Sequence, residues 1–289
     1  MADQGCGATE VHHRPIQCHP ELKIVGGTMP DKSIQDLLFT DFDGASVEDP
    51  DDVILEALDD PRYQQRVAPL TEFLETGSNP PYDRFLACCA LASWAEPAGY
   101  RAIVEAAQAG DETAWYGELV ERRYSVDETF VELAGAVRIS KDFAREKSTE
   151  GDRLAALRAL VGIADRCYFD WQLAAAIDDS TAIAVCDDVA ATVRRGIAAL
   201  THGERQPFDL GAQLSELVVS LITVDESTTV QLGYELARID TAPGTLMRLA
   251  AIASHGGTLA SRSFGEYLGT IGDDQVRAVA AQITARRAD

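Results

Sequence analysis

Lysine is scarce in this chain of 289 residues, where it occurs only at Lys23, Lys32, Lys141 and Lys147. Lys and Arg together number 25 against 47 Asp and Glu, which gives a formal net charge of -22. Proteins that bind nucleic acids or anionic membranes do so largely through Lys and Arg. The shortage of basic residues therefore argues against both partners. Two explanations of the acidity stay open: solubility or adaptation to high salt, and an acidic face that attracts a basic protein.

Long apolar runs are also missing. No stretch approaches the roughly 18 to 20 apolar residues that a membrane span requires. The first residues, MADQGCGATEVHHRPIQCHPELK, lack the apolar core of a secretory signal. We therefore expect a cytoplasmic protein without a membrane partner. In that compartment the six cysteines are expected to be mostly reduced thiols, because disulfides are rare there.

Catalytic signature motifs are absent as well. The sequence contains no phosphate-binding loop, dinucleotide fingerprint, nucleophile elbow, HExxH or CxxC. His202 and His255 each precede a glycine at an expected helix end, where an imidazole can meet the last carbonyl groups. These absences remove most enzyme classes that a motif identifies, and no motif indicates a cofactor. They do not remove an enzyme whose site is assembled from separate helices, so the question of catalysis stays open.

What the sequence does contain is helical periodicity, from about residue 51 onward. The clearest stripe is spaced i, i+3, i+4, i+7, i+8 and consists of Leu214, Leu217, Val218, Leu221 and Ile222. Alternation of period two is nowhere sustained, so no sheet of any size is expected. We predict an all-α protein of about a dozen helices.

Prolines and glycines mark the expected helix boundaries. Pro97 and Pro243 stand where a first helical turn tolerates the missing N–H group. Gly110, Gly203 and Gly256 follow apolar periodic runs, where a left-handed residue ends a helix.

The chain is expected to have two parts. Residues 1–50 contain prolines, a glycine pair and an acidic run, which predicts an irregular or partly disordered N-terminal arm with a short helix at 33–39. Residues 51–289 are predicted to form a helical-repeat domain. Within it, DRFLACCALASWAE from Asp83 aligns without gaps on DRLAALRALVGIAD from Asp152, 69 residues later. Weaker echoes begin at Ala212 and Thr245.

Over residues 51 to 287, these segments resemble the HEAT-repeat superfamily and related α-solenoids. The resemblance implies antiparallel helix pairs that stack side by side and offer a concave binding face. The chain departs from the family pattern because no Pro and Asp/Arg signature recurs at fixed offsets. A compact helical fold without a solenoid is therefore the alternative.

Potential metal ligands concentrate near the N-terminus, at Cys6, His12, His13, Cys18 and His19. Thiolates and imidazoles together suit a tetrahedral zinc ion. The spacing matches no zinc module, so the alternative is an arm in which these residues bind nothing.

A second group lies in ADRCYFDWQ and comprises Asp165, Arg166, Tyr168, Asp170 and Trp171. Two carboxylates, a guanidinium and two rings near one helix junction could anchor a cationic or planar ligand. We take Asp165 and Asp170 as candidate catalytic residues and the other three as candidate ligand-binding residues. Some HEAT-like bacterial proteins are alkylpurine DNA glycosylases, to which this group is similar in residue types alone. The alternative is an inter-helix turn whose rings fill the core.

A third group combines aromatic and basic residues: Trp115, Tyr116, Arg122 and Arg123. It is a candidate binding site for an anionic ligand. Paired arginines on a helix are more often a solvated face neutralised by nearby glutamates, which is the alternative here.

These observations favour an acidic α-solenoid that binds a basic protein, in the manner of an immunity protein, an antitoxin or a scaffold. One alternative is a HEAT-like helical enzyme that acts on a small or nucleotide-like substrate. The other is a subunit of a hetero-oligomeric enzyme, which would expose an apolar patch when isolated.

Overall fold

Helices make up most of the residues that the computed structural model describes, namely 32–121 and 126–286. The described strands are the two-residue segments β1 (Val120–Glu121) and β2 (Val126–Asp127), which pair antiparallel. The prediction of an all-α protein is therefore confirmed for these residues. The chain divides into Met1–Asp31 and Lys32–Asp289, and the described residues belong to the second unit.

Fifteen α-helices and two 3-10 helices lie in the described part of this unit. In chain order they are α1 (Ile34–Leu38), α2 (Pro50–Glu56), η1 (Pro61–Tyr63), α3 (Gln64–Glu75), α4 (Pro81–Ser93), α5 (Pro97–Ala109), η2 (Gly110–Glu112), α6 (Thr129–Ile139), α7 (Lys141–Lys147), α8 (Glu150–Val161), α9 (Gln172–Ala176), α10 (Asp179–Thr201), α11 (Leu210–Val219), α12 (Glu226–Ile239), α13 (Pro243–His255), α14 (Leu259–Ile271) and α15 (Asp274–Arg286).

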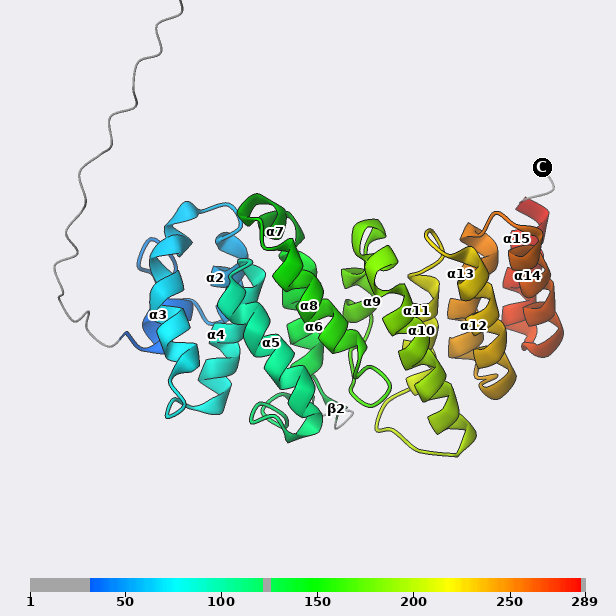
Figure 1. Ribbon diagram of the computed structural model, residues 1–289, viewed down its shortest axis with the longest axis horizontal. Coiled ribbons are helices and arrows are strands. Elements are labelled where there is room, and N and C mark those ends of the chain that lie inside the picture. The colour runs from blue at the N-terminus through cyan, green and yellow to red at the C-terminus, as the bar shows by residue number, and fades with distance from the viewer. Residues whose placement is uncertain (1–31, 122–125, 287–289) are drawn as a thin grey trace, which may run out of the picture. The chain divides into compact units, whose positions relative to one another are not determined.

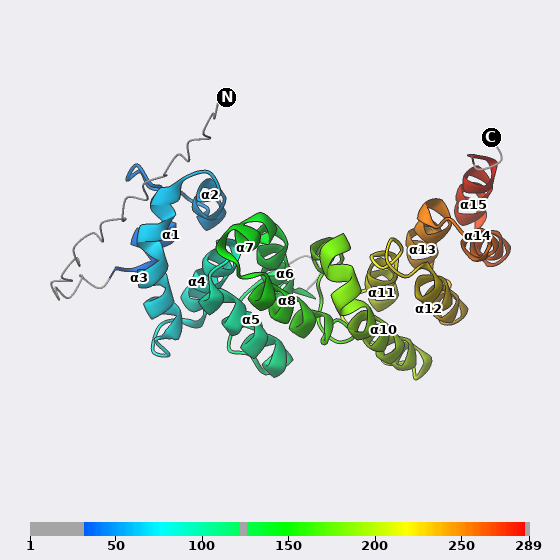
Figure 2. The ribbon, with the colours of Figure 1, turned by 45° about the horizontal axis from the view of Figure 1, so that its top comes forward.

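Helices that are close in the chain pack against each other, and their contacts form two series. In the first series α4 packs on α6, α6 on α9, α9 on α11, α11 on α13 and α13 on α15. In the second series α5 packs on α8, α8 on α10, α10 on α12 and α12 on α14. Further contacts, such as α4 with α5 and α10 with α11, join the two series. Figures 1 and 2 show the helices following one another in chain order.

The segment before α2 belongs to this helical unit. Ser33 caps α1 by accepting a hydrogen bond from the backbone N–H of Asp36, whose carboxylate accepts one from Ser33 in return. The short helix predicted at 33–39 is therefore present. Ile34, Leu37 and Leu38 are buried in the apolar core, although they fall within the arm predicted at 1–50. The first 31 residues of that arm lie outside the described residues.

Most of the predicted boundary residues stand where the sequence places them. Pro97 is the first residue of α5, and Pro243 is the first residue of α13. Gly110 ends α5 with φ 60°, and Gly203 follows α10 with φ 72°. Both lie in the left-handed region, which costs glycine least.

Gly256 ends α13 as predicted, but the prediction of a left-handed conformation is wrong. Its φ is -67° and its ψ is 146°, which is extended backbone. A Cβ at this position would lie 2.5 Å from the Cβ of Ser261 and 2.6 Å from Oε1 of Glu226. Close packing, and not backbone conformation, therefore accounts for glycine here.

The two longer segments that are similar in sequence lie in helices of different series. The segment from Asp83 contains most of α4, which belongs to the first series, whereas the segment from Asp152 contains most of α8, which belongs to the second. The weaker echoes from Ala212 and Thr245 fall in α11 and α13, which pack on each other. Both segments are rich in alanine and leucine because both helices pack into the core, α4 with every residue from Phe85 to Ser93 buried and α8 along one side.

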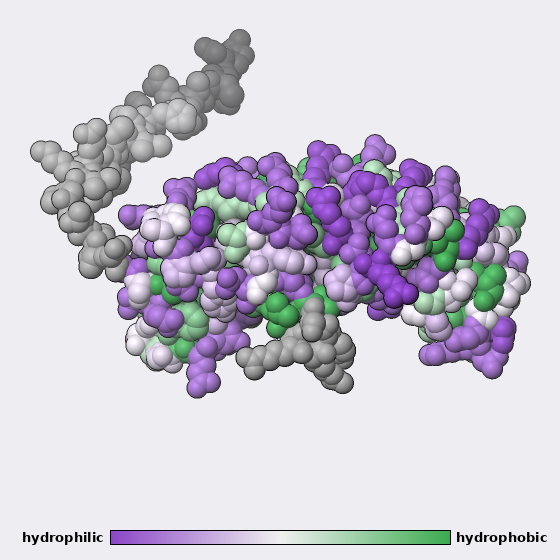
Figure 3. Space-filling view, turned by 90° about the horizontal axis from the view of Figure 1, so that it is seen from below, coloured by the Kyte–Doolittle hydropathy of each residue, from purple (hydrophilic) through white to green (hydrophobic). Residues whose placement is uncertain are grey.

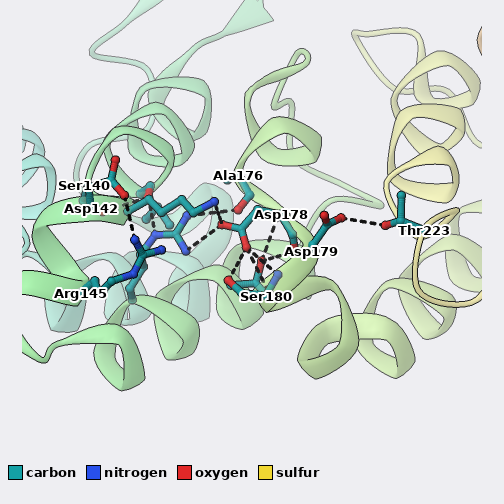
Figure 4. A network of polar contacts seen from close by, with 12 residues as sticks. Ser140, Asp142, Arg145, Ala176, Asp178, Asp179, Ser180 and Thr223 are labelled. Atoms are coloured by element: carbon teal, nitrogen blue, oxygen red, sulfur yellow. Dashed lines mark hydrogen bonds and ion pairs between the residues drawn. The ribbon is translucent and has the colours of Figure 1, made fainter.

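A polar network joins α7, α8 and α10 (Figure 4). Asp178 caps α10, because one of its carboxylate oxygens accepts hydrogen bonds from the N–H groups of Ser180 and Thr181 at 2.9 and 3.2 Å. The other oxygen lies 3.2 Å from Nζ of Lys141 and 3.8 Å from Nη1 of Arg153. This carboxylate therefore serves both as a helix cap and as the partner of two cations.

Arg153 extends the network to α6 and α9. Its side chain is buried, and it donates hydrogen bonds to the carbonyls of Val137 at 2.8 Å and Ala176 at 3.2 Å. These carbonyls lie near the C-terminal ends of α6 and α9, where backbone acceptors lack intrahelical partners. The buried guanidinium is thus held by contacts from three helices.

Candidate functional site

A pocket of about 580 Å³ opens at the N-terminal ends of α6, α9 and α11, beside the second turn of α13. Its volume falls within the range of small-molecule and side-chain binding pockets. Four carboxylates line it, those of Glu128, Asp170, Asp209 and Glu216, together with the guanidinium of Arg248. The pocket is therefore rich in acidic groups.

Helix capping explains part of this acidity. Asp209 accepts a hydrogen bond from the N–H of Ala212 at 2.9 Å and caps α11. Glu128 stands at the N-cap of α6, and Asp170 lies two residues before α9. A helix N-terminus carries only about half a positive elementary charge. The lining therefore holds four carboxylates and one guanidinium, and the N-terminal ends of α6 and α11 offset only part of this difference in charge.

The rest of the lining is aromatic and apolar. The rings of Tyr168 and Phe208 lie 5.5 Å apart between centroids, with an interplanar angle of 41°. Val126, Pro207 and Ala212 add apolar surface. An aromatic face attracts cations, so the rings and the carboxylates favour the same kind of ligand.

Gln213 of α11 fixes the segment that carries Tyr168 into the pocket. This buried side chain donates hydrogen bonds to the carbonyls of Ala164 at 2.7 Å and Cys167 at 2.9 Å, and accepts one from the N–H of Phe169 at 2.8 Å. Phe169 is itself fully buried, so it anchors the segment between α8 and α9 from the inside.

Electrostatics tie Tyr168 to its acidic surroundings. Burial raises the pKa of Tyr168, and the neighbouring carboxylates of Asp170 and Glu128 raise it further. The phenol therefore keeps its proton at neutral pH. Asp170 has φ 48°, in the left-handed region, which asparagine and aspartate adopt more readily than most residues.

The single guanidinium of the pocket already has partners. Nε of Arg248 lies 2.7 Å from Oε1 of Glu216, and its Nη1 donates a hydrogen bond to the carbonyl of Gly244 at 3.1 Å. The side chain of Arg248 remains 43% exposed and that of Glu216 remains 23% exposed. An ion pair in such a wet environment is weak, typically below about 1 kcal/mol.

The two candidate catalytic carboxylates, those of Asp165 and Asp170, lie in different surroundings. Asp165 does not line the pocket: both of its oxygens face Arg195 of α10, at 2.9 and 3.0 Å. Arg195 also donates to the carbonyl of Gly162 at 2.8 Å. Asp165 thus fastens α10 to the end of α8, while Asp170 lines the pocket.

The other candidates of this group divide in the same way. Tyr168 lines the pocket, whereas Arg166 is exposed and lies beside Gly110. Trp171 is 47% exposed, so it does not fill the core, and the guanidinium of Arg138 lies 5.0 Å from its ring centroid. Of the five residues proposed from the sequence, the pocket brings together Tyr168 and Asp170.

The aromatic and basic group is described only in part. Trp115 is buried and packs edge-on against Phe85, with ring centroids 5.9 Å apart. It also lines a separate pocket of about 440 Å³ beside α3, α4 and α5. Tyr116 is 38% exposed, and Arg122 and Arg123 lie outside the described residues.

The predicted zinc ligands Cys6, His12, His13, Cys18 and His19 also lie outside the described residues. Over 32–121 and 126–286, the structure places no three His, Cys, Asp or Glu side chains where they could hold a metal ion. In the same part of the chain, no helix has both the length and the apolar character needed to cross a bilayer.

The two histidines outside the N-terminal segment, His202 and His255, lie at the C-terminal ends of helices. Nδ1 of His255 lies 3.1 Å from the carbonyl oxygen of Ala251 at the end of α13, as predicted. His202 is the exposed C-cap residue of α10. Neither lines the acidic pocket.

Most of the pocket was not foreseen from the sequence, because five of its functional side chains come from separate segments: Glu128, Phe208, Asp209, Glu216 and Arg248. Asp209, which caps α11, stands before the clearest apolar stripe, and this spacing is a signal that the sequence analysis did not use. No protein family, curated protein or solved structure matches the chain.

Proposed function

We propose that the protein is an acidic α-solenoid of the HEAT-like type that binds a basic protein partner in the cytoplasm. The observation that carries this proposal is the acidic, aromatic pocket at the N-terminal ends of α6, α9 and α11. Its one guanidinium already faces Glu216, so Asp170 and Asp209 add negative charge beside the rings of Tyr168 and Phe208.

The packing of the helices supports the solenoid. In a solenoid each repeat contacts only its neighbours, and one helix of every pair contributes to a common binding face. The two series of contacts, α4 to α15 and α5 to α14, fit this description. The lining residues that lie on helices belong to α11 and α13 of the first series, and the others lie in the segments that lead into α6, α9 and α11.

The charge of the chain supports a basic partner. A net charge of -22 raises the rate of encounter with a positively charged protein, and this effect weakens as salt increases. The acidic pocket adds a defined place where that attraction becomes contact.

The other two functions have less support. The enzyme hypothesis named Asp165 and Asp170 as candidate catalytic residues, and Asp165 is engaged by Arg195 away from the pocket. The subunit hypothesis expects a broad apolar patch. The most exposed large apolar side chains, Ile183 and Leu259, lie on α10 and α14, and the face drawn in Figure 3 is mostly hydrophilic with small, separated apolar areas.

The test is capture of the partner with the tagged full chain from its native lysate, at about 50 and about 300 mM salt. The proposal predicts a stoichiometric partner with an excess of Lys and Arg that is released at the higher salt. A double variant, Asp170→Asn with Asp209→Asn, should capture much less of it. Asparagine suits both positions, because it adopts the left-handed conformation and caps helices as well as aspartate does.

The matched control is Asp59→Asn with Asp187→Asn, which removes the same charge at exposed positions outside the pocket. The control should capture as much partner as the unaltered chain. If both double variants capture equally, or if no basic protein binds at low salt, the proposed function is wrong.

A further inference from the structure

We infer that the pocket receives an arginine side chain of the basic partner, and that Arg248 competes with this side chain for Glu216. The inference rests on the proposed function and names the chemistry of the contact. It is carried by the combination of a cavity, two aromatic rings and a carboxylate that already binds a guanidinium within that cavity.

The lining matches the two parts of an arginine side chain. Arginine has an apolar stem and a planar, permanently charged head. Val126, Pro207 and Ala212 offer apolar surface for the stem. Tyr168 and Asp170 offer a ring and a carboxylate for the head, and both lie on the segment fixed by Gln213.

Arginine fits this lining better than lysine does. A guanidinium stacks on aromatic rings and binds carboxylates through two parallel hydrogen bonds, whereas an ammonium is a compact, strongly hydrated charge. The chain itself shows both guanidinium contacts nearby: Arg195 binds Asp165 through two nitrogens, and Arg138 lies over the ring of Trp171.

Arg248 forms an ion pair with one carboxylate of the pocket, and the pocket remains open beside it. Its Nε lies 2.7 Å from Oε1 of Glu216, and its side chain is 43% exposed. An incoming guanidinium would experience repulsion from Arg248 and would have to share Glu216 with it. Removal of Arg248 should therefore tighten the binding of a cation, although it removes a contact from the free protein.

The experiment measures the fluorescence anisotropy of labelled peptides with the full chain at about 50 mM salt. The three peptides share one sequence and differ only in the residue at the tested positions, which is arginine, lysine or the neutral isostere citrulline. The arginine peptide should bind about fivefold tighter than the lysine peptide, and the citrulline peptide should bind weakest. Tyr168→Leu should weaken the arginine peptide by about tenfold, while Tyr168→Phe should not. Thermal melts establish that each variant is folded.

Arg248→Gln gives the decisive comparison. It should tighten binding of the arginine peptide about threefold, and more than Arg262→Gln does. Arg262 is exposed on α14 and lies outside the pocket, so its variant makes the same change in net charge. Equal effects of the two variants, or equal affinity for the arginine and lysine peptides, would overturn the inference.

Such a result would leave the proposed function standing if a basic partner still depends on Asp170 and Asp209. The absence of any salt-sensitive basic partner would instead reject the proposed function, and the inference would fall with it.

Discussion

Exchange of Asp178 for alanine should lower the free energy of unfolding by about 3 kcal/mol. Two losses make up this figure. The helix cap on α10, with hydrogen bonds to Ser180 and Thr181, accounts for about 1 kcal/mol. The loss of the carboxylate that faces Lys141 and buried Arg153 accounts for about 2 kcal/mol. This is below the usual cost of breaking a buried pair, because Arg153 keeps its carbonyl partners and Lys141 is 41% exposed.

Asparagine at position 178 separates the two losses. Its side-chain oxygen can still cap α10, so Asp178→Asn should lose only the charge contribution of about 2 kcal/mol. Urea denaturation of the full chain at neutral pH, followed by the helical circular dichroism signal, measures both variants. If alanine and asparagine destabilise equally, the cap contributes nothing. If asparagine is harmless, the two ion pairs contribute nothing and the network of Figure 4 does not fasten α10 as described.

The same carboxylate should make stability depend on pH. Burial would raise the pKa of Asp178, but the hydrogen bonds from Ser180 and the nearby ammonium of Lys141 outweigh burial and lower the pKa from 3.8 to about 2. A lowered pKa in the folded state means that the unfolded state binds the proton first as the pH falls. The stabilisation is therefore complete above about pH 4 and is lost between about pH 4 and pH 2. The difference between the unaltered chain and Asp178→Asn should shrink over this window, and a constant difference would refute the argument.

Three further experiments test the packing of the helices. A Cβ at Gly99 would lie 2.3 Å from a backbone nitrogen of α4, whereas one at Gly151 meets nothing within 4 Å. In urea denaturation Gly99→Ala should therefore lower the free energy of unfolding by about 3 kcal/mol. Gly151→Ala should raise it by about 0.5 kcal/mol. Equal effects of the two variants would contradict the close contact of α4 with α5. Gln213→Leu leaves three backbone groups without their partner and should lower the free energy of unfolding by about 3 kcal/mol. A loss below about 1 kcal/mol would mean that Gln213 does not hold the segment before α9 in place. Burial raises the pKa of the thiols of Cys88 and Cys89, so iodoacetamide should modify them only after the chain unfolds. Mass spectrometry detects the modification. If both thiols are modified in the native chain, they are not buried.

Local features of the fold could be predicted from the sequence because local chemistry determines them. The stripe predicted buried positions: Leu214, Leu217 and Val218 of α11, and Leu221 just after it, are in the core. Pro97 and Gly110 mark the two ends of α5 because one lacks an N–H group and the other adopts φ 60°. Neither kind of signal depends on knowing which helices are neighbours.

The pocket could not be predicted in this way, because its composition depends on distant pairings. Asp165 and Asp170 are five residues apart in the chain, yet one is bound by Arg195, which is 30 residues away from it, and the other faces the pocket. The same holds for Gly256, whose neighbour Glu226 lies on the preceding helix α12. A sequence pattern shows that such residues are polar or small, but not which partner they meet.

The packing order explains why a site should arise at this place. The N-terminal ends of α6, α9 and α11 meet at the pocket, because Glu128, Asp170 and Asp209 all line it. Each end favours an acidic or capping side chain, so a row of such ends concentrates carboxylates without any of them being selected for binding. Aromatic side chains turn that edge into a site for a cation, because Tyr168 and Phe208 add a face on which a guanidinium can stack. The acidity of the pocket is thus partly a product of helix capping, and its specificity should depend on the two rings and on Arg248.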